Sequence, residues 1–316
     1  MKKFLRKTAI VFCVVAAGAM LINPPFKKGP HTSSTFMAAM ADKHRRLDSI
    51  GSPRILAVGG SNLAFGLNSE TLQDSFSMPV VNLGLHAGLG LTFILEEARH
   101  VIRSGDIVLL SCEYSINAKG DPRLENTAAW FYPGAADYYH VSSYDAFKLY
   151  LDYTHSRLED LLAGDYNPHP QKEDTVPVYS REGFNAYGDM VAHLSKGPAA
   201  ELRDRNDFPA DHHQETSELQ AFCAYAQSKN VKVIYLFPPY PVSEYTQQRQ
   251  KLGALAADLR KSLHTPIPDS PEDFIYSDSL FYDTVYHLNG KGRAARTARV
   301  IECLKQTHLF ARSPEL

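Results

Sequence analysis

Three side chains that together support nucleophilic catalysis occur in separate parts of this 316-residue chain. Ser61 follows an apolar run, Ile55 to Val58, and two glycines. His287 lies near the C-terminus, with the carboxylate of Asp283 four residues earlier. A carboxylate can orient an imidazole, which then takes the proton of a serine hydroxyl as the serine attacks an acyl group. The sequence therefore predicts Ser61 as nucleophile, His287 as general base and Asp283 as the acid that orients the base.

Ordinary alternatives exist for both parts of this constellation. Gly-Gly-Ser is common in turns that follow a strand, and an Asp and a His can share a surface loop by chance. The other histidines that we considered, His169, His212 and His213, stand in polar, loop-like surroundings typical of a solvated surface.

The elements that must position these residues alternate between strands and helices. The run at 55–58 is short, continuous and apolar, which is typical of a parallel strand buried on both faces. The glycines after it allow a sharp turn, and Asn68 is a predicted N-cap for the next helix. This alternation predicts an α/β domain with three layers, a parallel sheet between flanking helices. Strands are expected at 55–58, 79–83, 106–111 and 231–237, and helices at 68–76, 86–103, 215–229, 243–263 and from 289 onward.

A stretch rich in aromatic residues interrupts this pattern at about 114–214, with several Pro and Gly and no clear strand. We interpret it as a loop-rich insertion placed after the carboxyl end of a strand, on the side where such sheets bind ligands. Its aromatic side chains either form a small core of their own or stack on sugar rings. They include Trp130, Phe131, Tyr132, Tyr138, Tyr139, Tyr144, Tyr150 and Tyr153.

The N-terminus carries the features of an export signal. Residues 1–7 are basic and residues 8–22 are uncharged and mostly apolar. We expect residues 1–23 to act as a signal anchor, which keeps the domain on the periplasmic or extracellular side of the cytoplasmic membrane. Secretion after cleavage near Ala19 is the alternative. Residues 24–50 are polar and basic and are interpreted as a stalk that becomes helical from about Ser33, and residues 51–316 as the domain.

Composition excludes some classes of function. The net charge of -2 and the lack of a basic stripe argue against nucleic-acid binding. Cys13 lies in the export segment, and the remaining Cys112, Cys223 and Cys303 lie in apolar segments, so we expect buried free thiols. No zinc-ligand spacing is present, and we expect neither a metal nor a cofactor.

Three ordered blocks resemble the SGNH (GDSL-type) hydrolase superfamily: Ile55 to Gly66, Val81 to Gly84 and Tyr282 to Gly292. The chain most resembles the exported or membrane-anchored branch that acylates cell-envelope polymers, as in lipoteichoic acid D-alanylation and alginate or cellulose acetylation. The resemblance covers about 54–112 and 215–305. It implies an SGNH or flavodoxin-like fold, with Ser61 as nucleophile, His287 as base and Asp283 as its acid.

The resemblance also implies an oxyanion hole. Its backbone donors are Ser61 and the second-block glycine, which falls at Gly88, or at Ala87 if no residue is inserted. The third-block asparagine is absent, since residues 111–114 read Ser-Cys-Glu-Tyr, and Asn117 is a doubtful substitute.

Two further positions depart from the family pattern. Gly60 stands where an acidic residue usually precedes the serine, and three residues separate Asp283 from His287 where two are usual. Asp278 is the next candidate acid.

The expected function is that of an extracytoplasmic serine acyl-ester enzyme, either an O-acyltransferase or an esterase. Its expected partners are a cell-envelope glycan or a teichoic-acid-like polymer, the cytoplasmic membrane and a membrane acyl-donor protein. The first alternative is a non-catalytic SGNH-like protein that binds polymer or partners in an acylation or export complex. A lipid esterase is the second.

Overall fold

The computed structural model describes residues 6–7, 34–140, 148, 151, 155, 176–205, 212–307 and 310. The chain divides into two compact units, Met1–Pro30 with His140–Asp174, and His31–Tyr139 with Thr175–Leu316. Apart from Arg6 and Lys7, the predicted export segment lies outside the described residues, as do Tyr144, Tyr150 and Tyr153. The second unit contains the main sheet of the protein.

A four-stranded parallel sheet forms the centre of this unit. Its strands are β1 (Ile55–Gly59), β2 (Val80–Asn82), β3 (Ile107–Ser111) and β4 (Lys232–Tyr235), in the order β2-β1-β3-β4. In β1, Ile55 pairs with Val80 on one side and with Ile107 on the other. Every residue of β1, β2 and β3 is buried, as expected for strands covered on both faces. The predicted α/β fold is confirmed.

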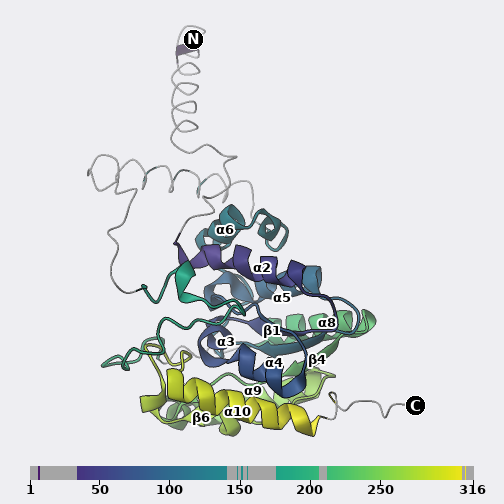
Figure 1. Cartoon of the computed structure of the whole chain (residues 1–316), viewed down its shortest axis with the longest axis vertical. Helices are drawn as coiled ribbons and strands as arrows, with labels where there is room; N and C mark the ends of the chain where they lie inside the picture. Colours follow the sequence, from purple (N-terminus) through teal and green to yellow (C-terminus); the bar gives the residue numbers. More distant parts are fainter. Residues whose placement is uncertain are drawn as a thin grey trace. The chain divides into compact units, whose positions relative to one another are not determined.

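Helices cover both faces of the sheet (Figure 1). On one face lie α2 (Ala39–Ser49) and α5 (Gly90–Val101), and α8 (His213–Ser228) packs beside α5. On the other face lie α3 (Ser61–Gly66), α4 (Ser69–Phe76) and α10 (Gly290–Gln306). The long helix α9 (Val242–Ser262) contacts a second, two-stranded parallel sheet of β5 (Tyr240–Pro241) and β6 (Ile275–Tyr276).

Two helix starts are fixed by local sequence. The Asn68 side chain accepts a hydrogen bond from the Thr71 N–H at 3.3 Å, so the predicted cap of α4 is confirmed. Asn289 caps α10 by accepting from the backbone N–H groups of Lys291 and Gly292. The short helix α3 was not expected from the sequence, because it has no side-chain cap and its residues after Ser61 are all buried by tertiary packing.

The segment before β1 requires a correction. Residues 36–49 form η1 (Phe36–Ala38) and α2, and their apolar side chains Met37, Met40 and Leu47 are buried in the main core. The spacing of three and seven residues places these side chains on one helix face. This part of the predicted stalk therefore belongs to the domain, which begins well before residue 51.

The described part of the insertion contributes no strand to the main sheet. It contains α6 (Pro122–Phe131) and the short helices η3 (Pro133–Asp137) and η4 (Arg181–Gly183). Its described tyrosines at 132, 138 and 139 pack against the main core, and the Tyr132 ring stacks on His44 at 3.9 Å between centroids. These three tyrosines therefore belong to the main core of the domain, and the expectation that the insertion's aromatic residues form a small core of their own is wrong for them.

The three cysteines of the described residues are free and buried, as predicted. Burial raises the pKa of the Cys223 thiol to about 12 and that of Cys303 to about 11. All three thiols are therefore protonated at neutral pH and chemically inert.

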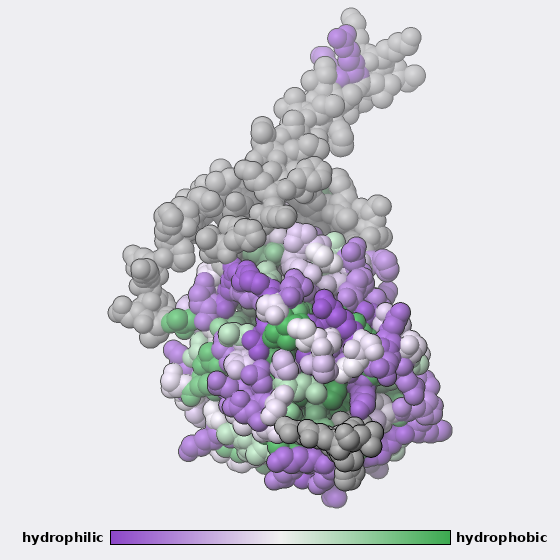
Figure 2. Space-filling model, turned by 45° about the vertical axis from the view of Figure 1, so that its right-hand side comes forward, coloured by the Kyte–Doolittle hydropathy of each residue, from purple (hydrophilic) through white to green (hydrophobic). Residues whose placement is uncertain are grey.

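Hydrophilic and hydrophobic residues are interspersed on the face of the molecule in Figure 2, where the hydrophobic ones occupy small areas. No helix in the described part of the chain is long and apolar enough to cross a membrane.

Candidate active site

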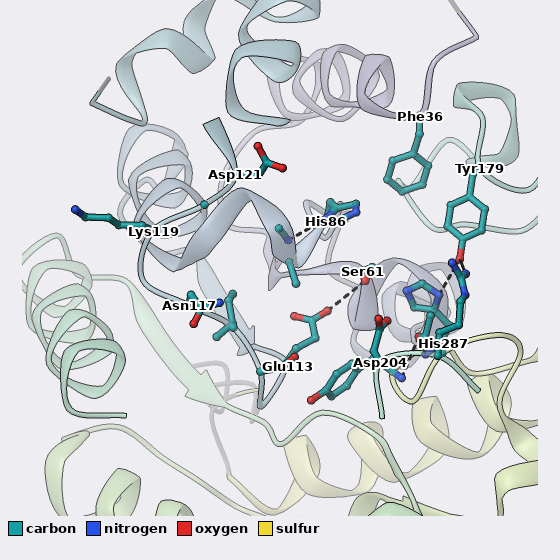
Figure 3. Close-up of a pocket in the computed structure, with 18 residues that line it drawn as sticks. Phe36, Ser61, His86, Glu113, Asn117, Lys119, Asp121, Tyr179, Asp204 and His287 are labelled. Atoms are coloured by element: carbon teal, nitrogen blue, oxygen red, sulfur yellow. Dashed lines mark hydrogen bonds between the residues drawn. The ribbon is translucent and has the colours of Figure 1, made fainter. Parts of the chain in front are cut away.

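The candidate site lies where the strand order of the sheet reverses direction. The chain passes from β1 to β2 on one side and then from β2 to β3 on the other, so the reversal falls between β1 and β3. Ligands of open α/β sheets bind at the carboxyl ends of such strands. Ser61 follows β1 here, and Glu113 follows β3. Both line a pocket of about 590 Å³, together with His287 (Figure 3).

The structure brings His287 and Asp283 together, as the sequence predicts. Nδ1 of His287 lies 2.9 Å from Oδ1 of Asp283, and both residues are buried. The Phe65 ring stacks on the imidazole at 3.9 Å and 6°. Asp278 points elsewhere, since it accepts a hydrogen bond from the Ser243 N–H. Asp283 is therefore the carboxylate that orients His287.

Two residues of the insertion hold the second oxygen of Asp283. The Tyr179 hydroxyl and the Arg203 guanidinium both donate to Oδ2, and the hydroxyl lies 3.2 Å from Nδ1 of His287. The backbone fixes the same arrangement, because the Arg203 N–H donates to the Asp283 carbonyl at 2.9 Å. Sequence reasoning did not find Tyr179 and Arg203, and no motif marks them.

These contacts set the ionisation of Asp283. Burial acts to raise its pKa, but hydrogen bonds from His287, Tyr179 and Arg203, together with the charge on His287, lower the pKa to about 2. Burial and the bond to Asp283 raise the pKa of Tyr179, which therefore stays a hydroxyl donor. The carboxylate is thus ionised throughout the physiological pH range.

Arg203→Ala and Tyr179→Phe are expected to change the acid stability of the protein. A lowered carboxyl pKa contributes stability that is complete above the unfolded pKa of about 4 and is lost as pH falls through the folded pKa. Without these donors the folded pKa of Asp283 rises, so the variants lose this contribution closer to pH 4. Urea unfolding between pH 7 and pH 2 measures it, with Arg103→Ala, a change at an exposed arginine, as the control. Parallel stability curves for variants and wild type would contradict the assignment.

Ser61 has a different partner from the one that the triad requires. Among the described residues its Oγ donates to Oε1 of Glu113 at 3.4 Å, and it makes no hydrogen bond with His287. The Glu113 carboxylate fills the space beside Gly60, where an added Cβ would lie 2.3 Å from Oε2. Residue 60 is therefore a glycine for a local reason, because the Glu113 carboxylate occupies the space that a side chain at this position would need.

The predicted oxyanion donors are only partly assembled. The Gly88 N–H donates to Nδ1 of His86 at 2.9 Å, and burial lowers the pKa of His86, which favours the neutral acceptor form. The Ser61 N–H is at the first position of α3 and has no partner within the helix. Asn117 is exposed in the pocket wall, and Ala87 lines the same pocket. An oxyanion would have to displace His86 from Gly88 to use that donor.

A cluster of buried polar side chains surrounds Asn82, at the end of β2. The Asn82 amide donates to the Leu63 carbonyl and to Asp189, each at 2.9 Å, and Asp189 also accepts from Arg293 at 2.7 Å. Lys43 donates to the Asn82 carbonyl at 2.9 Å, and burial lowers its pKa to about 7. The cluster thus joins the end of β2 to α2, the insertion and α10.

The sheet order and the two helical layers define the class of fold as α/β, flavodoxin-like or SGNH-like. No protein-family model matches the sequence, and a search of curated proteins finds no similar one. Within the described residues, no cluster of three or more His, Cys, Asp or Glu is placed to hold a metal ion.

Proposed function

We propose that the protein is an extracytoplasmic serine acyl-ester enzyme, an O-acyltransferase or an esterase that acts on a cell-envelope polysaccharide or teichoic-acid-like polymer. The observation that carries the proposal is that Ser61 and His287 line one pocket at the carboxyl edge of the sheet, and that the buried Asp283 carboxylate holds Nδ1 of His287 at 2.9 Å. The polymer, the membrane location and a membrane acyl-donor partner follow from the predicted export segment and from the SGNH resemblance.

The chemistry starts when the Ser61 hydroxyl turns from Glu113 towards His287. Asp283 occupies Nδ1 of the imidazole, so Nε2 accepts the proton while Oγ attacks the ester carbonyl carbon. The proton then passes from Nε2 to the leaving alcohol, and an acyl-serine remains. Water or a second hydroxyl then gives its proton to Nε2 as it attacks the acyl carbon, and Nε2 passes that proton to Oγ as the bond to Ser61 breaks. The acceptor alone distinguishes an esterase from a transferase.

A non-catalytic binding protein is the second candidate, and two observations favour it. Ser61 donates to Glu113 at 3.4 Å, and the Gly88 N–H is occupied by His86. A lipid esterase has less support, because the described residues of the pocket wall are mostly polar or charged.

Labelling with a fluorophosphonate probe tests the proposal, since only an activated serine reacts quickly. We expect the wild type to be labelled and Ser61→Ala to lose at least about 99% of the label, as expected when the nucleophile is removed. Ser115→Ala, which removes a second serine of the pocket wall, should keep it. Equal labelling of Ser61→Ala and wild type, or no labelling of either, would favour the binding protein.

Mass spectrometry of the envelope glycan in cells with and without the protein separates the two reactions. Loss of an ester in the absence of the protein indicates a transferase, and a gain of ester indicates an esterase.

A further inference from the structure

One carboxylate oxygen of Glu113, Oε2, is buried without a hydrogen-bond partner among the described residues. Glu113 is 3% exposed and lines the pocket next to Ser61. Its Oε1 accepts from the Asn62 N–H at 2.7 Å and from Ser61. Its Oε2 is buried and has no hydrogen-bond partner within the described residues. A buried carboxylate oxygen without a donor costs free energy, so a ligand that supplies one gains affinity.

A buried guanidinium offsets the charge of this carboxylate from behind. Arg296 is 1% exposed and donates to the Asn62 carbonyl at 2.6 Å, to the Asn62 side chain at 2.9 Å and to Ser111 at 3.0 Å. Asn62 therefore connects the guanidinium to Glu113, because its own N–H donates to Oε1. With this charge balance inside the protein, Oε2 needs a neutral donor and not a cation.

The position of Glu113 defines where that donor must be. Figure 3 shows the carboxylate between Ser61 and Asn117, at the wall of the pocket. Since Oε1 lies 3.4 Å from Oγ of Ser61, a group that reaches Oε2 is only a few bonds from the carbonyl that Ser61 attacks. A pocket of about 590 Å³ has the size typical of small-molecule sites.

We propose that Oε2 of Glu113 binds a neutral hydroxyl group next to the ester of the substrate, so the substrate is the ester of a diol or polyol. The inference rests on the proposed function for the ester, but the hydroxyl subsite is a property of Glu113. The hydroxyl of a bound substrate donates a hydrogen bond to Oε2. An ester with a methyl group at the same position leaves Oε2 buried without a donor.

A matched pair of small esters tests the subsite: 2-hydroxyethyl acetate, and propyl acetate, in which a methyl replaces the hydroxyl. We expect kcat/KM, corrected for spontaneous hydrolysis, to favour the hydroxylated ester by about tenfold or more, because an unpaired buried polar group is strongly rejected. In Glu113→Gln the amide oxygen stays on the Asn62 N–H and the NH2 faces the pocket. The substrate hydroxyl can still accept from this NH2, but the bond is no longer charge-assisted, so the preference should fall to about a third of its wild-type value or less. Glu70→Gln, on the exposed start of α4, should keep the wild-type preference.

The outcomes separate the subsite from the proposed function. If Glu113→Gln stays folded and hydrolyses both esters more slowly by the same factor, the preference for the hydroxylated ester is unchanged. The proposed hydroxyl subsite is then wrong, but the proposed enzymatic function is not contradicted. If neither ester is hydrolysed and Ser61 takes no fluorophosphonate label, the proposed function fails. Saturation-transfer NMR with ethylene glycol then tests the subsite alone: binding lost in Glu113→Gln supports it, and binding equal to wild type overturns it.

Discussion

His287→Ala is expected to slow acylation of Ser61 by about a thousandfold or more, because a serine hydroxyl without a base is a weak nucleophile. The reaction is followed as the rate of fluorophosphonate labelling or as ester hydrolysis. The imidazole is buried, stacked on Phe65 and held by Asp283, so its loss removes the base of the proposed triad. His100→Ala, on the exposed side of α5, serves as the control and should react like wild type.

Asp283→Asn tests the contribution of the carboxylate that orients His287. An amide at this position misorients the imidazole or fixes the wrong tautomer, so the loss should be about as large as for His287→Ala, or smaller. If His287→Ala reacts at the wild-type rate, the histidine is not the base and the triad is wrong. If only Asp283→Asn is fully active, the carboxylate has a structural role and His287 acts without it.

Arg296→Ala is expected to lower the free energy of unfolding by about 3–5 kcal/mol, the range for breaking a buried charged network and emptying a large buried site. The change removes three hydrogen bonds, two to Asn62 and one to Ser111, and leaves the Glu113 carboxylate without the charge that offsets it. Burial lowers the pKa of Arg296 to about 10, which still leaves the group charged at neutral pH.

Urea unfolding at pH 7 measures this loss, with Arg299→Ala as the matched control. Arg299 lies one turn of α10 further along and pairs at the surface with Asp273 and Glu302. Exposed pairs of this kind contribute about 0–1 kcal/mol. A similar small loss for both variants would show that the Arg296 network does not stabilise the domain.

The sequence by itself determined what depends on neighbours along the chain. The apolar runs of β1 and β3 identify buried parallel strands because such strands lack polar alternation. Asn68 and Asn289 mark helix starts because a cap bonds to N–H groups two or three residues away. Asp283 and His287 are four residues apart, so one loop brings them together. The apolar run at 55–58 and the two glycines after it predicted a turn that places Ser61 at the carboxyl edge of the sheet.

Only the tertiary structure decided which distant side chains complete the site. Tyr179 and Glu113 are 104 and 52 residues from their partners Asp283 and Ser61, and no local pattern encodes such contacts. The stalk boundary was wrong and α3 was missed for a related reason, because burial against the rest of the domain, and not a cap or a charge pattern, holds these segments in place. Contacts made across the fold depend on packing and desolvation, which the residue types alone do not specify.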